Sequence, residues 1–142
     1  RKCWPVSSFA AVIQQLIERN ISVLLLAGPA DSERVNTILR RLAPLASAAM
    51  LKVLHNASLL EVAGGLQGCR GYLGNDSGIT HLAAMLGVPT IALFGPTDPA
   101  IWSPVGPSVE VIQVPILEEL SVDVIMEAIN TFFKEMWDST SG

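Results

Sequence analysis

The chain has 142 residues, the length of one ordinary domain; half of them are apolar and only 15% are charged. This composition excludes a disordered tail, a collagenous segment and a disulfide-stapled miniprotein. The net charge of −4, with the basic residues scattered along the chain, argues against nucleic acid as a partner, because a phosphate backbone requires clustered Lys and Arg. The apolar runs are also far shorter than the roughly 18 residues of a transmembrane segment.

The first half of the chain alternates helical periodicity with short apolar runs. Apolar residues at helical spacing between Phe9 and Ile17 predict a first helix. Ser7 or Ser8 is expected to cap this helix, and Asn20 to end it. The next predicted elements are a strand over Ile21–Ala27, a helix over Ser32–Leu42, a strand over Met50–Leu54 and a helix over Ser58–Gln67.

The second half continues this alternation. A short strand over Gly71–Gly74 leads into a helix that Gly87 is expected to end. The remaining predicted elements are a central strand over Val88–Phe94, a loop over Gly95–Pro99, a strand over Val109–Val114 and an amphipathic helix capped by Ser121. Strands and helices that alternate in this way favour parallel βαβ units, and hence an open α/β sheet with helices on both faces.

Ligands of open α/β sheets bind at the carboxyl ends of the strands, where this chain has three loops rich in small or polar residues. These loops are Ala27–Glu33, Gly74–His81 and Phe94–Trp102. The middle loop runs from a strand directly into a helix, whose free N–H groups and partial positive charge suit a phosphate.

Several side chains of the middle loop could serve such a ligand. Ser77 and Thr80 can add hydroxyl donors, Gly78 allows close approach to the backbone, and His81 can donate if it points toward the cleft. The structural alternative is that Asp76 and Ser77 are N-cap residues and that His81 packs in the core. Because its carboxylate would repel a diphosphate, Asp76 fits a cap or an acceptor for sugar hydroxyls better than a phosphate ligand.

The first loop offers two carboxylates, Asp31 and Glu33, directly after a strand. Either can accept hydrogen bonds from ribose hydroxyls, as acidic residues do in dinucleotide sites. The structural alternative is that Asp31 caps the following helix and Glu33 lies in its first turn.

Known catalytic fingerprints are absent from the sequence. It contains no GxGxxG, GxxxxGK[ST], GxSxG or HExxH segment, which argues against hydride transfer, P-loop phosphoryl transfer and a metalloprotease site. With two lone histidines, a metal site or a Ser-His triad is not expected. Cys3 and Cys69 form no CxxC pair, so we expect the reduced thiols of a cytoplasmic protein, a single bridge between them being the alternative.

Four segments stand out in chain order: K-C-W-P from Lys2, G-P-A-D from Gly28, D-S-G-I-T-H-L-A-A from Asp76 and L-F-G-P-T-D-P from Leu93. Together they resemble the bacterial lipopolysaccharide heptosyltransferases, the family-nine glycosyltransferases, over essentially the whole chain. The last two segments are specific as a pair. The resemblance implies a GT-B-type fold of paired Rossmann-like halves, in which residues 1–142 form the C-terminal half that binds the nucleotide sugar.

By position, the resemblance also implies roles for individual residues. Lys2 would meet the diphosphate, Asp31 or Glu33 the ribose, and the stretch His55–Leu59, which includes Asn56, would border the adenine. Ser77 and Gly78 would offer backbone N–H groups to phosphate, while Asp76 and His81 would line the donor side of the cleft.

The implied reaction is an inverting, metal-independent transfer of heptose from ADP-heptose to a lipid-linked lipopolysaccharide core acceptor, without a further cofactor. The enzyme would be cytoplasmic and act at the inner face of the inner membrane. The family's general base belongs to an N-terminal half outside these residues, as does a central strand before Lys2, so we expect no catalytic residue here and no transfer by this piece alone. A catalytically idle nucleotide-binding module and half of a sugar-nucleotide epimerase are alternatives, although the G-P-T-D-P loop counts against the epimerase.

Overall fold

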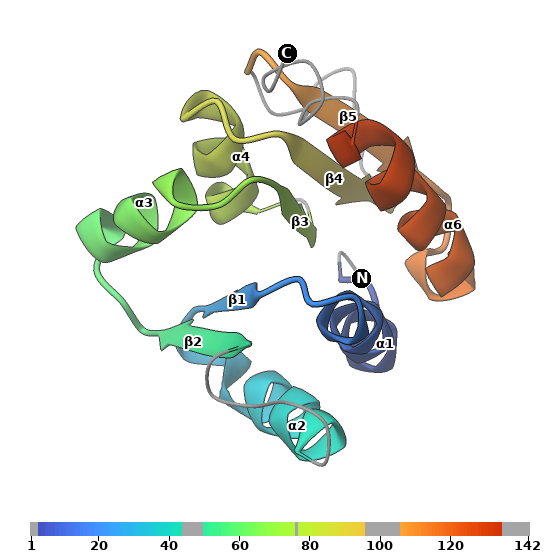
Figure 1. Ribbon diagram of the computed structural model, residues 1–142, viewed down its shortest axis with the longest axis horizontal. Coiled ribbons are helices and arrows are strands. Elements are labelled where there is room, and N and C mark those ends of the chain that lie inside the picture. Colours follow the sequence, from blue (N-terminus) through green and yellow to red (C-terminus); the bar gives the residue numbers. More distant parts are fainter. Residues whose placement is uncertain (1–2, 44–49, 76, 96–105, 135–142) are drawn as a thin grey trace. The chain divides into compact units, whose positions relative to one another are not determined.

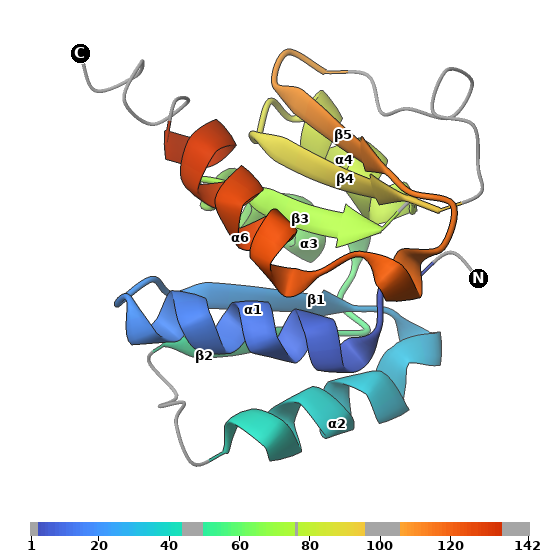
Figure 2. The ribbon, with the colours of Figure 1, turned by 90° about the vertical axis from the view of Figure 1, so that its right-hand side faces the viewer.

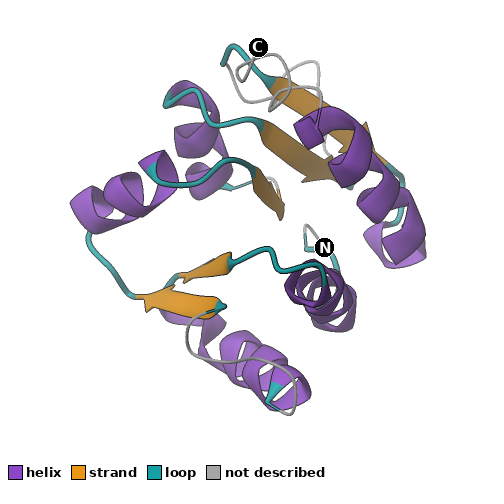
Figure 3. Cartoon of the chain, in the orientation of Figure 1, coloured by secondary structure: helices purple, strands orange, loops and turns teal. Residues whose placement is uncertain are grey.

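The computed structural model describes residues 3–43, 50–75, 77–95 and 106–134. The chain divides into two compact units, Pro5–Val62 and a second one that combines Arg1–Trp4 with Ala63–Gly142. Both units alternate parallel strands with helices (Figures 1 and 3). The predicted parallel α/β class is therefore confirmed.

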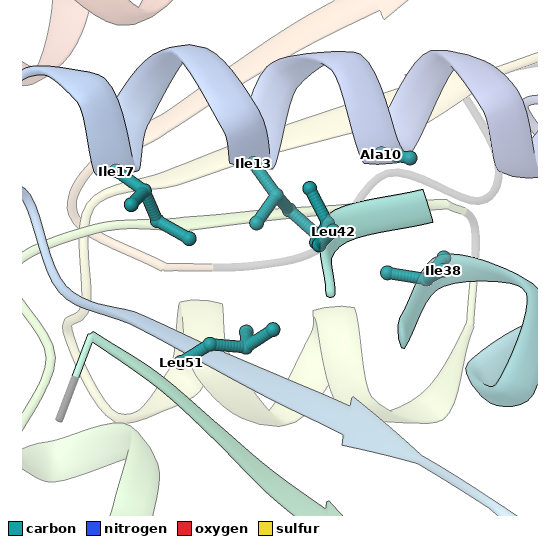
Figure 4. Packing of buried hydrophobic residues seen from close by; sticks show 6 residues of the cluster. All are labelled: Ala10, Ile13, Ile17, Ile38, Leu42 and Leu51. Atoms are coloured by element: carbon teal, nitrogen blue, oxygen red, sulfur yellow. The ribbon is translucent and has the colours of Figure 1, made fainter. Parts of the chain in front are cut away.

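The Pro5–Val62 unit contains a two-stranded parallel sheet. Its elements are α1 (Val6–Glu18), β1 (Val23–Ala27), a 3-10 turn over Pro29–Asp31, α2 (Ser32–Leu42) and β2 (Leu51–His55). Val23 is paired with Leu51, and Ala27 with His55, so the two strands end at the same level. Both helices pack into one apolar cluster with the start of β2, formed by Ala10, Ile13, Ile17, Ile38, Leu42 and Leu51 (Figure 4).

Helix α1 begins and ends by different means. It begins at Val6 with Pro5 at the N-cap and no side-chain cap, so the prediction of a Ser7 or Ser8 cap is wrong; both serines lie in the first turn. Proline suits this position because its fixed φ is compatible with a helix start and its missing N–H leaves no donor unpaired. The predicted stop at Asn20 is confirmed: φ is +62° there, and Ile21 donates its N–H to the carbonyl of Leu16 in a Schellman arrangement.

The second unit contains a three-stranded parallel sheet, which the chain enters through α3 (Leu59–Gln67). The further elements are β3 (Tyr72–Asn75), α4 (Gly78–Met85), β4 (Thr90–Phe94), β5 (Val109–Gln113), a 3-10 turn over Leu117–Glu119 and α6 (Val122–Ala128). The strand order is β3-β4-β5, and every residue of β4 is buried, as its continuous apolar sequence predicts. Helices α4 and α6 lie on opposite faces of this sheet (Figures 1 and 2).

Helix ends in this unit largely follow the sequence prediction. Gly87 has φ of +84° just beyond α4, and Ser121 accepts a hydrogen bond from the N–H of Val124 at the start of α6. Helix α6 continues as a π-helical turn over Ile129–Phe133, which hydrophobic periodicity did not indicate.

The structure differs from the predicted open sheet in one respect: the strands belong to two sheets. Within the described residues, β1 pairs only with β2, and β3 pairs only with β4. In the same described ranges, no helix is both long and apolar enough to cross a membrane.

Candidate functional site

The carboxyl end of β3 leads directly into the start of α4. Ser77 is the N-cap residue of α4, and its hydroxyl oxygen accepts the N–H of Thr80 at 3.4 Å, which confirms the capping role. Gly78 is the first helical residue and is exposed; among the described residues, no atom other than those of its chain neighbours and of the helix backbone lies within 4 Å of the position that a Cβ would take. Because the first N–H groups of a helix have no intrahelical acceptor, this open helix start can receive an anion.

Thr80 lies beneath this helix start. It is fully buried, and its hydroxyl donates to the backbone carbonyl of Asn75. Its single proton is therefore engaged inside the protein, so the expectation that Thr80 supplies a hydroxyl donor to a ligand is wrong. The hydroxyls of Tyr72 and Ser77 lie 3.1 Å and 3.2 Å from the same oxygen.

Since the Thr80 hydroxyl has only acceptor capacity left, Tyr72 and Ser77 must donate to it. Burial raises the pKa of Tyr72, which keeps its phenol protonated and able to donate. Gly74 makes room for the Tyr72 ring, since a Cβ at position 74 would lie 2.6 Å from Cε1 of that ring. Sequence reasoning missed Tyr72, because an apolar strand with one Tyr gives no signal of a polar contact.

Asn75 connects this strand end to the chain before α1. Its Oδ1 accepts the backbone N–H of Trp4 at 2.8 Å, and the indole N–H of Trp4 donates to the carbonyl of Leu120 at 3.0 Å. Trp4 is therefore held through both its backbone and its ring, and its side chain is only 1% exposed. Asn75 was part of the predicted middle loop, but its anchoring role was not foreseen.

The loop after β1 is closed by a carboxylate. Oδ2 of Asp31 accepts the N–H of Gly28 at 3.0 Å, while Oδ1 lies 3.7 Å from the guanidinium of Arg34. Asp31 occupies the N-cap position of α2 but makes no side-chain cap bond to it, so the structural alternative, a cap of α2, is not formed through the side chain. Glu33 lies exposed in the first turn of α2, as predicted.

The turn after β2 lies beside this loop. Nε2 of His55 is 3.3 Å from the Ser32 hydroxyl, and the N–H of Asn56 donates to the carbonyl of Ala27 at 3.1 Å. Asn56 has φ of +58°, a conformation that Asn tolerates better than most residues. Loop and turn thus form one polar edge, and Ser32 is a member that the sequence did not suggest.

A reciprocal cap follows this turn at the start of α3. The N–H of Ser58 donates to the Glu61 carboxylate at 2.9 Å, and the Ser58 hydroxyl accepts the N–H of Glu61 at 3.2 Å. The hydrogen bond from the Ser58 N–H, and after it the hydrogen bond of the Ser58 side chain to the carboxylate, lower the pKa of Glu61. The stretch expected to border adenine therefore ends in a fixed helix start.

The predicted site residues fall into two groups, one in each unit. Asp31, Glu33 and Asn56 belong to the polar edge of the Pro5–Val62 unit, whereas Ser77, Gly78 and His81 belong to the β3–α4 junction. His81 is half-buried and is the fourth residue of α4. Lys2 and Asp76 lie outside the described residues, as does most of the third loop.

Cysteine and metal chemistry give no further site. Cys3 and Cys69 are both half-buried and are not joined in a disulfide, and burial raises the pKa of Cys69. In the ranges that the structure describes, no three His, Cys, Asp or Glu side chains are grouped so that they could hold a metal ion.

Two parallel sheets with polar loops at the carboxyl ends of their strands define the class: a parallel α/β protein, in which ligands generally bind at such ends. The particular family follows from comparison with known proteins. The family model for glycosyltransferase family 9 (heptosyltransferase) matches residues 1–127, and the chain belongs to this family.

Three known proteins illustrate the similarity. Lipopolysaccharide heptosyltransferase 1 of Pseudomonas aeruginosa is 38% identical over 108 residues, which cover 75% of this chain and 29% of that protein. The structure of E. coli ADP-heptose LPS heptosyltransferase II superimposes with a TM-score of 0.82 at 27% identity, over 94% of this chain and 42% of the other. E. coli heptosyltransferase WaaC with ADP superimposes with a TM-score of 0.78 at 29% identity, over 89% and 39%. The chain thus spans less than half the length of each of these proteins.

Proposed function

We propose that this chain is the nucleotide-sugar-binding part of a glycosyltransferase that transfers heptose from ADP-heptose to a lipopolysaccharide core acceptor. The observation that carries the proposal is the similarity to an E. coli heptosyltransferase solved with ADP, which extends over 89% of this chain. Family membership over residues 1–127 supports the same reaction class.

The diphosphate of the donor is proposed to lie at the start of α4. The N–H groups of Ser77 and Gly78 would bind it, because helix N-termini carry partial positive charge and the space at Gly78 is open. Lys2 would add a full positive charge, as the family resemblance implies. Asp76 and His81 would face the sugar, and the negative charge of Asp76 favours hydroxyl groups over phosphate as its ligands.

The nucleoside is proposed to lie at the polar edge formed after β1 and β2. A carboxylate offers about four acceptor sites, so Asp31 retains acceptor capacity for ribose hydroxyls after its bond from Gly28. Glu33, exposed one turn away, is the alternative ribose ligand. His55 and Asn56 would border the adenine.

The reaction is proposed to invert the anomeric centre without a metal or a further cofactor. The acceptor hydroxyl would attack the anomeric carbon opposite the departing ADP, while a base outside this chain removes the hydroxyl proton. Within the chain, the α4 start and Lys2 would stabilise the negative charge that grows on ADP as the glycosidic C–O bond breaks. We place the enzyme in the cytoplasm at the inner face of the inner membrane, where a lipid-linked saccharide is the acceptor and the remaining domain of the protein is the partner.

Thermal unfolding in the presence of ADP tests donor binding. A ligand that binds only the folded state stabilises it by about 2.7 kcal/mol at a hundredfold excess over Kd, so ADP should raise Tm by several degrees. EDTA should leave this rise unchanged if no metal takes part. The proposal is wrong if millimolar ADP produces no rise in protein that circular dichroism shows to be folded.

A further inference from the structure

The β3–α4 junction contains a set of hydrogen bonds among its own residues. These bonds are complete without any group of a bound nucleotide sugar. Thr80 is at the centre of this set: it is fully buried, it donates to the carbonyl of Asn75, and it accepts from the hydroxyls of Tyr72 and Ser77. The partners come from the beginning and end of β3 and from the N-cap of α4. One side chain thereby sets how the first turn of α4 meets the end of β3.

Asn75 extends this set to a third segment. While its backbone carbonyl accepts from Thr80, its side-chain Oδ1 accepts the N–H of Trp4. The ring of Trp4 is fixed in turn by its bond to Leu120.

Given the donor-binding role proposed above, we propose that Thr80 and Asn75 are positioning residues of the diphosphate site. Thr80 orients the N–H groups of Ser77 and Gly78, and Asn75 fixes the end of β3 from which they follow, because its side chain is bonded to Trp4. Neither residue needs to touch the nucleotide sugar. The backbone N–H groups would then face one phosphate because the first turn of α4 is fixed to the end of β3.

The chain provides a matched control for Thr80. Thr90 is equally buried in the same unit, and its hydroxyl also donates to a backbone carbonyl, that of Val88 at 2.8 Å. It lies at the beginning of β4, at the opposite end of the sheet from the carboxyl ends of the strands. Thr80→Val and Thr90→Val therefore remove the same group from the same kind of environment, and only the first change reaches the proposed site.

Calorimetric titration of ADP and adenosine into both variants tests the inference. Thr80→Val should weaken ADP by roughly tenfold or more, the cost of one misplaced hydrogen bond to a charged group, and leave adenosine unchanged. Thr90→Val should leave the ratio of the two affinities as in the unmodified protein, and Thr80→Ser, which keeps the hydroxyl, should restore ADP binding. If Thr80→Val does not fold, Tyr72→Phe removes one donor to the same oxygen and should show the same selective loss to a smaller degree.

An equal loss of ADP and adenosine in Thr80→Val, or no loss of either, would overturn the positioning role. Asn75 is tested in the same titration. Asn75→Ala removes the acceptor of the Trp4 N–H, so it should weaken ADP severalfold and leave adenosine unchanged. An equal loss of both ligands would contradict that part. Failure of the unmodified protein to bind ADP at all would instead refute the proposed function.

Discussion

A charge placed at the cap of α4 should separate folding from phosphate binding. Ser77 is exposed and caps the helix through its hydroxyl oxygen, a role that Asp and Asn fill about equally well. Ser77→Asp should therefore leave the free energy of unfolding within about 1 kcal/mol, since attraction to the helix N-terminus offsets the lost hydroxyl donor. Ser77→Asn has the same shape without the charge and is the matched control.

The expected loss of ADP affinity follows from the geometry of the helix start. A carboxylate that accepts the Thr80 N–H and a phosphate oxygen on the Gly78 N–H would be roughly 5 Å apart, because each lies about 3 Å from a donor of the same turn. Coulomb repulsion at that distance is about 3 kcal/mol at an effective dielectric constant of 20, and about 1 kcal/mol in water. Ser77→Asp should thus weaken ADP roughly 5- to 150-fold relative to Ser77→Asn.

Calorimetric titration of both variants measures this difference, and chemical denaturation checks that they are equally stable. Adenosine, which lacks the diphosphate, should bind both variants alike. If the two variants bind ADP equally, the phosphate does not lie at the start of α4 and the reasoning fails.

Three further predictions address other parts of the account. Leu42→Ala should lower the free energy of unfolding, measured in urea, by about 2–5 kcal/mol, because the Leu42 side chain is 1% exposed and packs between α1 and α2 (Figure 4). The control is Leu39→Ala on the same helix, which should cost under about 1 kcal/mol because Leu39 is 37% exposed. Equal losses of stability in the two variants would contradict this packing. Lys2→Ala should weaken ADP roughly ten- to a hundredfold in calorimetry and spare adenosine, and a parallel loss for both would exclude a phosphate contact. Asp76→Asn should weaken an ADP-sugar while ADP binding holds or improves; matching changes for the two ligands would contradict a contact between Asp76 and the sugar.

Local elements were predictable from the sequence because their determinants are local. Ser32–Leu42 is a helix with the predicted bounds, Asn20 and Gly87 end their helices with positive φ, and the continuous apolar run in Thr90–Phe94 is a fully buried strand. In each case neighbouring residues carry the signal. The resemblance to family-nine glycosyltransferases also came from short segments and is confirmed.

Features that depend on contacts between distant segments were not predictable. The hydrogen bond from Trp4 to Asn75 joins residues far apart in the sequence, and the Ser32–His55 contact joins the ends of two strands. Thr80 shows the same limit at short range. Its position in the sequence suggested a hydroxyl that donates to a ligand, but the side chain is buried and donates its proton to the carbonyl of Asn75. Strand periodicity likewise carries no information about how the strands are divided between sheets.

The central claim has two parts: the start of α4 binds the diphosphate of the nucleotide sugar, and the edge formed after β1 and β2 binds its nucleoside. Amide resonances of the protein titrated with ADP, and separately with adenosine, test it most directly. The account predicts that ADP shifts the amides of Gly78 and Ile79 together with those of Ser32 and Asn56, whereas adenosine shifts only the second pair. If ADP leaves Gly78 and Ile79 unchanged, or if adenosine shifts them as strongly as ADP does, the proposed placement of the donor is wrong.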